Sequence, residues 1–196
     1  MPHNILSPLA TALGIAVVFT GLMASDAEAS TSGDSDGPWK VTDIKALVTA
    51  EARNLGLPVA LALAVAKVES DFRPHLESHK GARGVMQVMP ATALEEYAII
   101  PEMLWNPRIN VRLGLHFLQR LLVRYEGRVD LALSYYNGGS RVGSLPNARV
   151  IPATRGYVTK VRTWQRRYQR QAWSGGATWK SSKRPGTSWK RERVQN

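Results

Sequence analysis

The chain of 196 residues contains no cysteine. This absence excludes a disulfide scaffold, a thiolate metal site, a cysteine nucleophile and a lipid-modified cysteine anchor. Long hydrophobic runs are also missing, since the apolar stretch over residues 9–24 is shorter than the roughly 20 residues that cross a bilayer. Hydrophobic residues nevertheless make up 44% of the chain, which excludes global disorder. We therefore expect one folded domain of about 130 residues with an extension at each end.

Acidic residues are scarce toward the C-terminus. Residues 160–196 contain 11 lysines and arginines and one acid, Glu192, whereas residues 1–159 contain 15 basic and 14 acidic residues. Most of the net charge of +11 therefore lies at the end of the chain. We expect residues 171–196 to form a basic disordered tail, because they include few aliphatic residues. Trp173, Trp179 and Trp189 among these charges fit binding to an anionic polymer, and a solvated tail without a dedicated partner is the alternative.

The N-terminal extension has the pattern of an export signal. The apolar stretch over 9–24 is followed by Ala27-Glu28-Ala29, so residues 1–29 are interpreted as a signal peptide that is cleaved after Ala29. The first eight residues carry no lysine or arginine, and an uncleaved membrane anchor is the alternative. Residues 30–41 are small, polar and rich in glycine, and we expect a linker. An exported protein of the periplasm or cell envelope follows from this interpretation.

The domain over 42–170 has the hydrophobic periodicity of helices. Prolines 58, 90 and 107 stand where first helical turns are expected, and Gly56 and Gly127 stand where helices should end. Helices are expected over residues 42–54, 59–70, 91–99, 108–126, 131–136 and 155–170. The predicted fold class is all-α, or at most α+β if the loop over 71–89 contains a short hairpin.

Glu69 is the strongest catalytic candidate in the sequence. It lies in the last turn of a helix, residues 59–70, that is apolar on nearly every side and is therefore expected at the centre of the domain. Burial and the negative end of the helix dipole both disfavour an anion at this position, so the pKa of Glu69 should be raised. A carboxyl group that keeps its proton near neutral pH can act as a general acid. The structural alternative is an exposed glutamate in a terminal turn.

The residues that follow Glu69 resemble the soluble lytic transglycosylase family, whose catalytic domain is lysozyme-like. Glu69-Ser70 is followed by Gly81-Ala82-Arg83-Gly84-Val85-Met86-Gln87-Val88-Met89-Pro90 and Thr92-Ala93, with Val85 in place of the usual leucine. Further matches are Asn110 with Gly114, the segment over 134–139, and the segment over 151–158. Tyr135 and Gly138 replace alanines of the family pattern, and Ala153 replaces its glutamate.

The resemblance implies a peptidoglycan lytic transglycosylase with Glu69 as its single acid and base. It would cleave the β-1,4 bond between N-acetylmuramic acid and N-acetylglucosamine and form 1,6-anhydromuramic acid, with no metal and no cofactor. The substrate-binding residues that it implies are Ser78, Gln87, Met89, Tyr136, Asn137 and Tyr157, with Tyr136 next to the acid. Each has a structural alternative: a loop cap for Ser78, a helix C-cap for Asn137, and core packing for the tyrosines.

Other functions stay open at this point. A lysozyme-type hydrolase on the same fold would end the reaction with water, and a non-catalytic wall-binding or scaffold module would not need Glu69. His75 and His79 lack a third metal ligand, which argues against a metal site. The expected partners are peptidoglycan glycan strands, and the basic tail is a candidate contact to an anionic envelope polymer or a secretion or conjugation apparatus. Nucleic acid conflicts with export, and we expect a monomer.

Overall fold

The structure is a computed structural model that describes residues 38–175. The predicted signal peptide over 1–29 lies outside the described residues, as do most of the linker over 30–41 and nearly all of the basic tail. Within residues 38–175, no helix is both long enough and apolar enough to cross a membrane.

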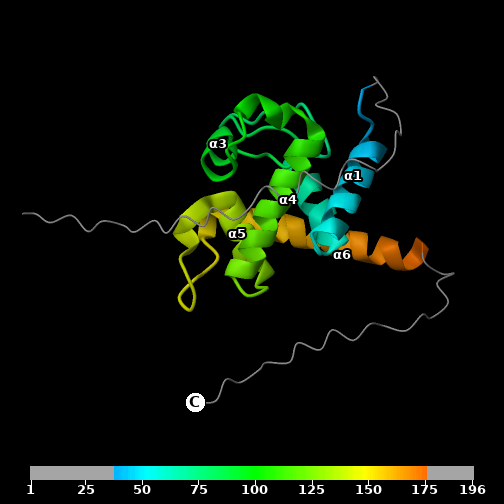
Figure 1. Ribbon diagram of the computed structural model, residues 1–196. Helices are drawn as coiled ribbons and strands as arrows, with labels where there is room; N and C mark the ends of the chain where they lie inside the picture. Colours follow the sequence, from blue (N-terminus) through cyan, green and yellow to red (C-terminus); the bar gives the residue numbers. More distant parts are fainter. Residues whose placement is uncertain (1–37, 176–196) are drawn as a thin grey trace, which may run out of the picture. The chain divides into compact units, whose positions relative to one another are not determined.

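The described residues form helices joined by loops and short 3-10 turns (Figure 1). The α-helices are α1 (Val41–Asn54), α2 (Val59–Ser70), α3 (Pro90–Tyr97), α4 (Pro107–Arg124), α5 (Val129–Gly138) and α6 (Arg155–Gly175). The 3-10 helices are η2 (Pro101–Trp105), η3 (Gly139–Val142) and η4 (Pro152–Thr154). The prediction of an all-α fold is thereby confirmed, and the prolines at 90 and 107 occupy first helical turns as expected.

The loop over 71–89 contains two isolated β-bridges, Glu77 with Arg83 and Arg83 with Val88, so the described residues include no hairpin of regular strands. One expectation about the helices was wrong in detail. Helix α6 continues to Gly175, whereas the sequence predicted its end at Arg170 and the tail from 171. The five residues over 171–175 are too few to show a helical period of their own, so the sequence did not reveal that α6 continues through them.

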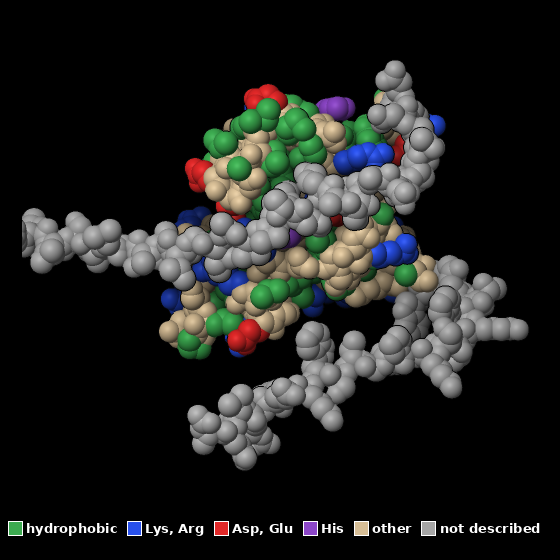
Figure 2. All heavy atoms as spheres, viewed as in Figure 1, with side chains coloured by type: hydrophobic (Ala, Val, Ile, Leu, Met, Phe, Trp, Pro, Cys, Tyr) green, Lys and Arg blue, Asp and Glu red, His purple; other side chains and the backbone are tan. Residues whose placement is uncertain are grey.

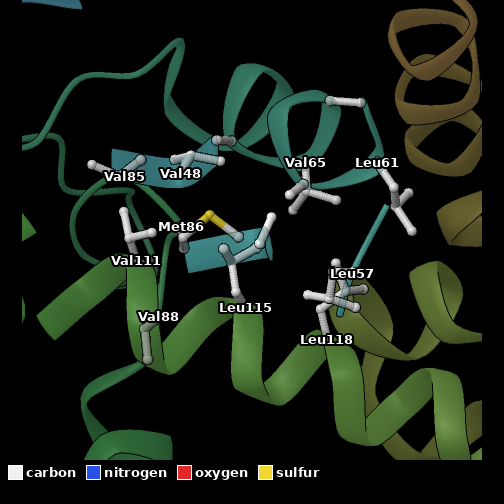
Figure 3. Packing of buried hydrophobic residues seen from close by; sticks show 14 of the residues in the cluster. Val48, Leu57, Leu61, Val65, Val85, Met86, Val88, Val111, Leu115 and Leu118 are labelled. Carbon is white, nitrogen blue, oxygen red and sulfur yellow. The ribbon is translucent and has the colours of Figure 1, made fainter. Parts of the chain in front are cut away.

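Helix α2 lies at the centre of the domain and packs against α1 and α6. Leu61 and Val65 of α2 face Leu115 and Leu118 of α4 in the core, and all four side chains are fully buried (Figure 3). Burial of a leucine or valine side chain contributes about 1.5–3 kcal/mol, so this part of the core stabilises the position of α2. The core thereby fixes the end of α2, where Glu69 lies.

Helix α4 connects two parts of the domain. In Figure 1, α3 and the loops around it lie on one side, whereas α5 lies on the other and α6 passes behind α4. Contacts of α4 with α1, α5 and η2 fix this arrangement.

Candidate active site

The end of α2 is joined to the glycine-containing loop that follows it. Asp71 ends the helix in the left-handed conformation, with φ 54°. The buried Ser70 hydroxyl donates a hydrogen bond to the carbonyl oxygen of Val85 at 2.8 Å. Glu69 and the loop over 81–89 are therefore held next to each other by the residue that follows the acid.

Glu69 has the electrostatic environment of a general acid. Burial raises the pKa of Glu69 from 4.5 to about 7, and a hydrogen bond from Tyr157 offsets part of this increase. The Tyr157 hydroxyl donates to Oε1 of Glu69 at 2.5 Å. Lys67 does not neutralise the carboxyl, because its ammonium pairs with Asp71 and lies 4.8 Å from the centre of the Trp164 ring. A large fraction of Glu69 therefore keeps its proton near neutral pH.

Tyr157 reaches Glu69 because α5 and η4 hold the start of α6 in place. The buried Ser134 hydroxyl lies 2.7 Å from the Thr154 hydroxyl and accepts a hydrogen bond from the backbone N–H of Ile151 at 3.2 Å. Gly138 permits this close packing, since a Cβ atom there would lie 2.6 Å from side-chain atoms of Ile151 and Thr154. Gly138, where the family pattern has alanine, is thus explained by its contact with the segment that carries Tyr157.

The Asn110 side chain fixes the loop from the other side. It is fully buried, and it accepts from the backbone N–H of Met86 at 2.8 Å and donates to the carbonyl oxygens of Arg83 and Leu104 at 2.8 and 3.1 Å. Gly84 adopts φ +76° directly against it, and a Cβ atom at Gly84 would lie 2.4 Å from Nδ2 of Asn110. Asn110 and Gly84 therefore act as one structural unit, although they are far apart in the sequence.

Gly114 brings α4 close to the same loop. A Cβ atom at this position would lie 2.3 Å from Cβ of Met86 and 3.1 Å from the Tyr136 hydroxyl. That hydroxyl donates to the carbonyl oxygen of Met86 at 2.9 Å. Burial and the negative charge of Glu69 both raise the pKa of Tyr136 well above its usual value, so its hydroxyl remains a donor.

Three of the predicted substrate-binding residues lie together. Gln87, Met89 and Tyr136 line one recess next to α4. Met89 is 40% exposed, and other hydrophobic side chains also reach the surface around α3 (Figure 2). The recess is further lined by Val88, Thr92, Tyr97, Leu113, Gly114 and Phe117. Glu69 does not line the recess itself. Tyr136 does, and it lies near enough to Glu69 for the negative charge of the carboxylate to raise the pKa of the Tyr136 hydroxyl.

The other predicted residues are placed differently. The Ser78 hydroxyl accepts from the backbone N–H groups of Lys80 and Ala82 at 3.3 and 3.0 Å, which is the loop cap that the sequence left open. Asn137 is exposed within α5, and Gly139 rather than Asn137 is the C-cap. The hydrogen bond to Glu69 comes from Tyr157, whereas the Tyr136 hydroxyl donates to the carbonyl oxygen of Met86.

Two lining residues were missed in the sequence. Phe117 follows Gly114 by three positions on α4, and this helical spacing was a signal that could have identified it. Tyr97 donates to or accepts from Nδ1 of His116 at 3.1 Å, and no spacing connects these two residues in the sequence. Both residues enter the recess only because α3 packs beside α4.

Two acidic residues that follow Glu69 in the described part of the chain are paired with basic side chains. Asp71 pairs with Lys67, and Glu77 pairs with Arg83 at 3.4 Å. Between residues 38 and 175, no group of three or more His, Asp or Glu side chains could hold a metal ion. Glu69 is thus the carboxyl group with the environment of an acid catalyst.

Comparisons with known proteins agree with this site. The family model of the transglycosylase SLT domain matches residues 46–145. Soluble lytic murein transglycosylase of Escherichia coli strain K12 is 28% identical over 58% of this chain and 21% of its own length. A putative soluble lytic murein transglycosylase of Haemophilus influenzae is 33% identical over 61% of this chain and 24% of its own length.

A solved structure of an inactive mutant of lytic transglycosylase Slt from Pseudomonas aeruginosa has 28% identity and a TM-score of 0.57, over 65% of this chain and 24% of that one. The fold is therefore the lysozyme-like fold of lytic transglycosylases. The chain belongs to the transglycosylase SLT domain family. It spans about a fifth to a quarter of the length of the relatives named here.

Proposed function

We propose that this domain is a peptidoglycan lytic transglycosylase that cleaves the β-1,4 bond between N-acetylmuramic acid and N-acetylglucosamine. The observation that carries the proposal is the half-buried Glu69 carboxyl at the end of α2, whose hydrogen-bond partner is the neutral Tyr157 hydroxyl and whose pKa is raised to about 7 by desolvation. The names of the relatives, which include lytic murein transglycosylases, support the same substrate.

In the first step, protonated Glu69 gives its proton to the glycosidic oxygen, and the bond from this oxygen to the anomeric carbon of the muramyl sugar breaks. The carbonyl oxygen of the sugar's own 2-acetamido group then bonds to the anomeric carbon. This internal nucleophile replaces the second carboxylate that most retaining glycosidases use. The hydrogen bond from Tyr157 stabilises the Glu69 carboxylate that the step produces.

In the second step, the Glu69 carboxylate accepts the proton of the muramyl C6 hydroxyl group. The C6 oxygen attacks the anomeric carbon and displaces the acetamido oxygen, which closes the 1,6-anhydro ring. Glu69 is protonated again at the end, and no water is consumed. A single carboxyl with a pKa near the working pH serves both steps, because neither of its protonation states is strongly disfavoured.

Gln87 is proposed to bind an acetamido group in the recess. Its Nε2 atom donates to the carbonyl oxygens of Leu76 and Gly84, both at 3.0 Å. These bonds hold the side chain in place and leave its Oε1 atom to accept from an acetamido N–H. Met89 and Tyr136, which line the same recess, would contact the sugar rings. We also propose substrate contacts for Ser78, Asn137 and Tyr157. The position of Tyr157 next to Glu69 further supports a role in orienting the acid.

The test is a comparison of the wild-type protein with Glu69→Gln on purified sacculi. Mass spectrometry of the wild-type products should find muramyl ends that are one water lighter than reducing ends, and Glu69→Gln should abolish turnover while circular dichroism stays unchanged. Reducing ends would indicate the hydrolase instead. Undiminished function of Glu69→Gln would indicate a non-catalytic wall-binding module.

For the whole chain, we propose an exported envelope protein that acts as a monomer, with a signal peptide over 1–29 and a linker over 30–41. Relatives named as soluble and as membrane-bound lytic murein transglycosylases support an envelope location. The basic tail is proposed to bind anionic envelope polymers, and it begins after Gly175, where α6 ends.

A further inference from the structure

A second recess follows the first along α4. It is lined by Glu96 of α3, by residues of α4 between Phe117 and Arg124, and by Tyr135 of α5. Phe117 lines both recesses, so the two are adjacent and share a wall. The first recess contains Gln87 and Tyr136, so the second recess lies beside the candidate substrate site, toward the C-terminal end of α4.

Arg124 brings an unpaired positive charge to this second recess. Its guanidinium lies 5.0 Å from the centre of the Tyr135 ring and 5.8 Å from that of Tyr125, and Nη2 donates to the Ser144 hydroxyl at 3.4 Å. No carboxylate within residues 38–175 forms an ion pair with it. Two aromatic contacts and a hydrogen bond hold the guanidinium in position. Little conformational entropy of the Arg124 side chain would therefore be lost when an anion binds.

The second arginine of the recess differs from Arg124. Nη1 of Arg120 lies 2.6 Å from Oε2 of Glu96, so its charge is already neutralised within the protein. Among the described residues that line it, the recess therefore offers one cation without an ion-pair partner, beside an aromatic wall in which the ring centres of Phe117 and Tyr135 are 6.4 Å apart. This combination fits a ligand with a carboxylate next to a sugar ring or aliphatic group.

We infer that the second recess binds a carboxylate of the glycan strand outside the cleaved bond, through Arg124, while Phe117 and Tyr135 contact the adjoining sugar or peptide. The inference rests on the proposed function, since it assigns a further part of the same substrate to the site. Two groups on a peptidoglycan strand provide this chemistry, namely the lactyl carboxylate of a muramyl residue without peptide and the carboxylates of a peptide stem.

The test measures equilibrium binding in the Glu69→Gln background, so that turnover does not affect the result. Four oligosaccharides of equal length are compared: strands with peptide stems, strands with the stems removed, strands with all carboxylates amidated, and uncharged N-acetylglucosamine oligomers. Arg124→Gln should raise the Kd about two- to fivefold for a carboxylate-bearing strand and leave it unchanged for both neutral ligands. The carboxylate strand that responds more strongly identifies the source of the bound group.

The matched control is Arg128→Gln, which removes the same charge from an exposed residue outside both recesses. Its Kd values should equal those of the parent, and the salt dependence of binding should decrease only for Arg124→Gln. Equal changes for the two arginine variants, or an equal change for neutral and charged ligands, would overturn the inference. The proposed function fails by a different result, namely the absence of anhydro products from the wild-type protein.

Discussion

The raised pKa of Glu69 predicts a specific pH dependence of stability. Glu69→Gln replaces a carboxyl that must lose its proton as the pH rises by an amide that stays neutral at every pH. The folded protein holds the Glu69 proton up to about pH 7, whereas the unfolded chain releases it around 4.5. The contribution of protonated Glu69 to the free energy of unfolding is therefore fully present below pH 4.5 and is lost as the pH rises through about 7.

The size of the effect follows from the two pKa values. The difference between 4.5 and about 7 corresponds to about 3 kcal/mol, at about 1.4 kcal/mol for each pH unit. The free energy of unfolding of the wild-type protein, relative to that of Glu69→Gln, should therefore fall by about 3 kcal/mol between about pH 4 and pH 8.5. Any constant difference caused by the amide itself cancels in this comparison.

The assay is urea unfolding of both proteins, followed by circular dichroism at several pH values, together with an NMR titration of the Glu69 carboxyl carbon. The titration should give a midpoint near 7, and the difference in unfolding free energy should change over the same range. Two results would refute the reasoning, and with it the role of Glu69 as a general acid. One is a difference in unfolding free energy that is the same at both ends of the pH range; the other is an NMR titration midpoint near 4.5.

Four further predictions concern the same site and its supports. Tyr157→Phe removes the hydrogen bond that lowers the pKa of Glu69, so the alkaline limb of kcat/KM should move to higher pH; an unmoved limb would contradict this role. Asn110→Ala takes the side-chain partner from the buried Met86 N–H and the Leu104 carbonyl oxygen, and should cost about 3 kcal/mol in urea unfolding; a loss below about 1 kcal/mol would show that the loop is held otherwise. Gly114→Ala forces Met86 to move and should cost about 1–3 kcal/mol and lower activity, which melting curves and sacculus digestion would test. Removal of residues 176–196, which spares α6, should weaken binding to whole sacculi in a pull-down assay with an unchanged melting temperature; equally tight binding would exclude a role for the tail.

The sequence predicted the helices well, because hydrophobic periodicity, prolines and glycines act locally. The helix over 59–70 was predicted with the bounds that α2 has, since Pro58 precedes it and its apolar faces predict burial. The 3-10 helices and the final turn of α6 were missed. Their residues carry no periodic signal of sufficient length, and tertiary contacts decide their conformation.

The candidate site was predicted in part. The position of Glu69 at the end of a buried helix was sufficient to predict a raised pKa, because burial of that helix also buries the carboxyl. The hydrogen bond from Tyr157 was not predictable from spacing, since 88 positions separate the two residues. The same holds for Asn110, whose role depends on a loop that precedes it by more than 20 residues.

The sequence alone therefore determined the order of the helices, the place of the acid on one of them and the basic character of the C-terminal end. The tertiary structure decided which tyrosine donates to that acid, which side chains line the recess beside α4, and that Arg124, next to Tyr135, has no ion-pair partner among residues 38–175. The physical reason is the range of the forces involved. Helix formation depends on neighbours a few positions apart, whereas burial, hydrogen bonding across loops and charge pairing depend on how α2, α4, α5 and α6 pack.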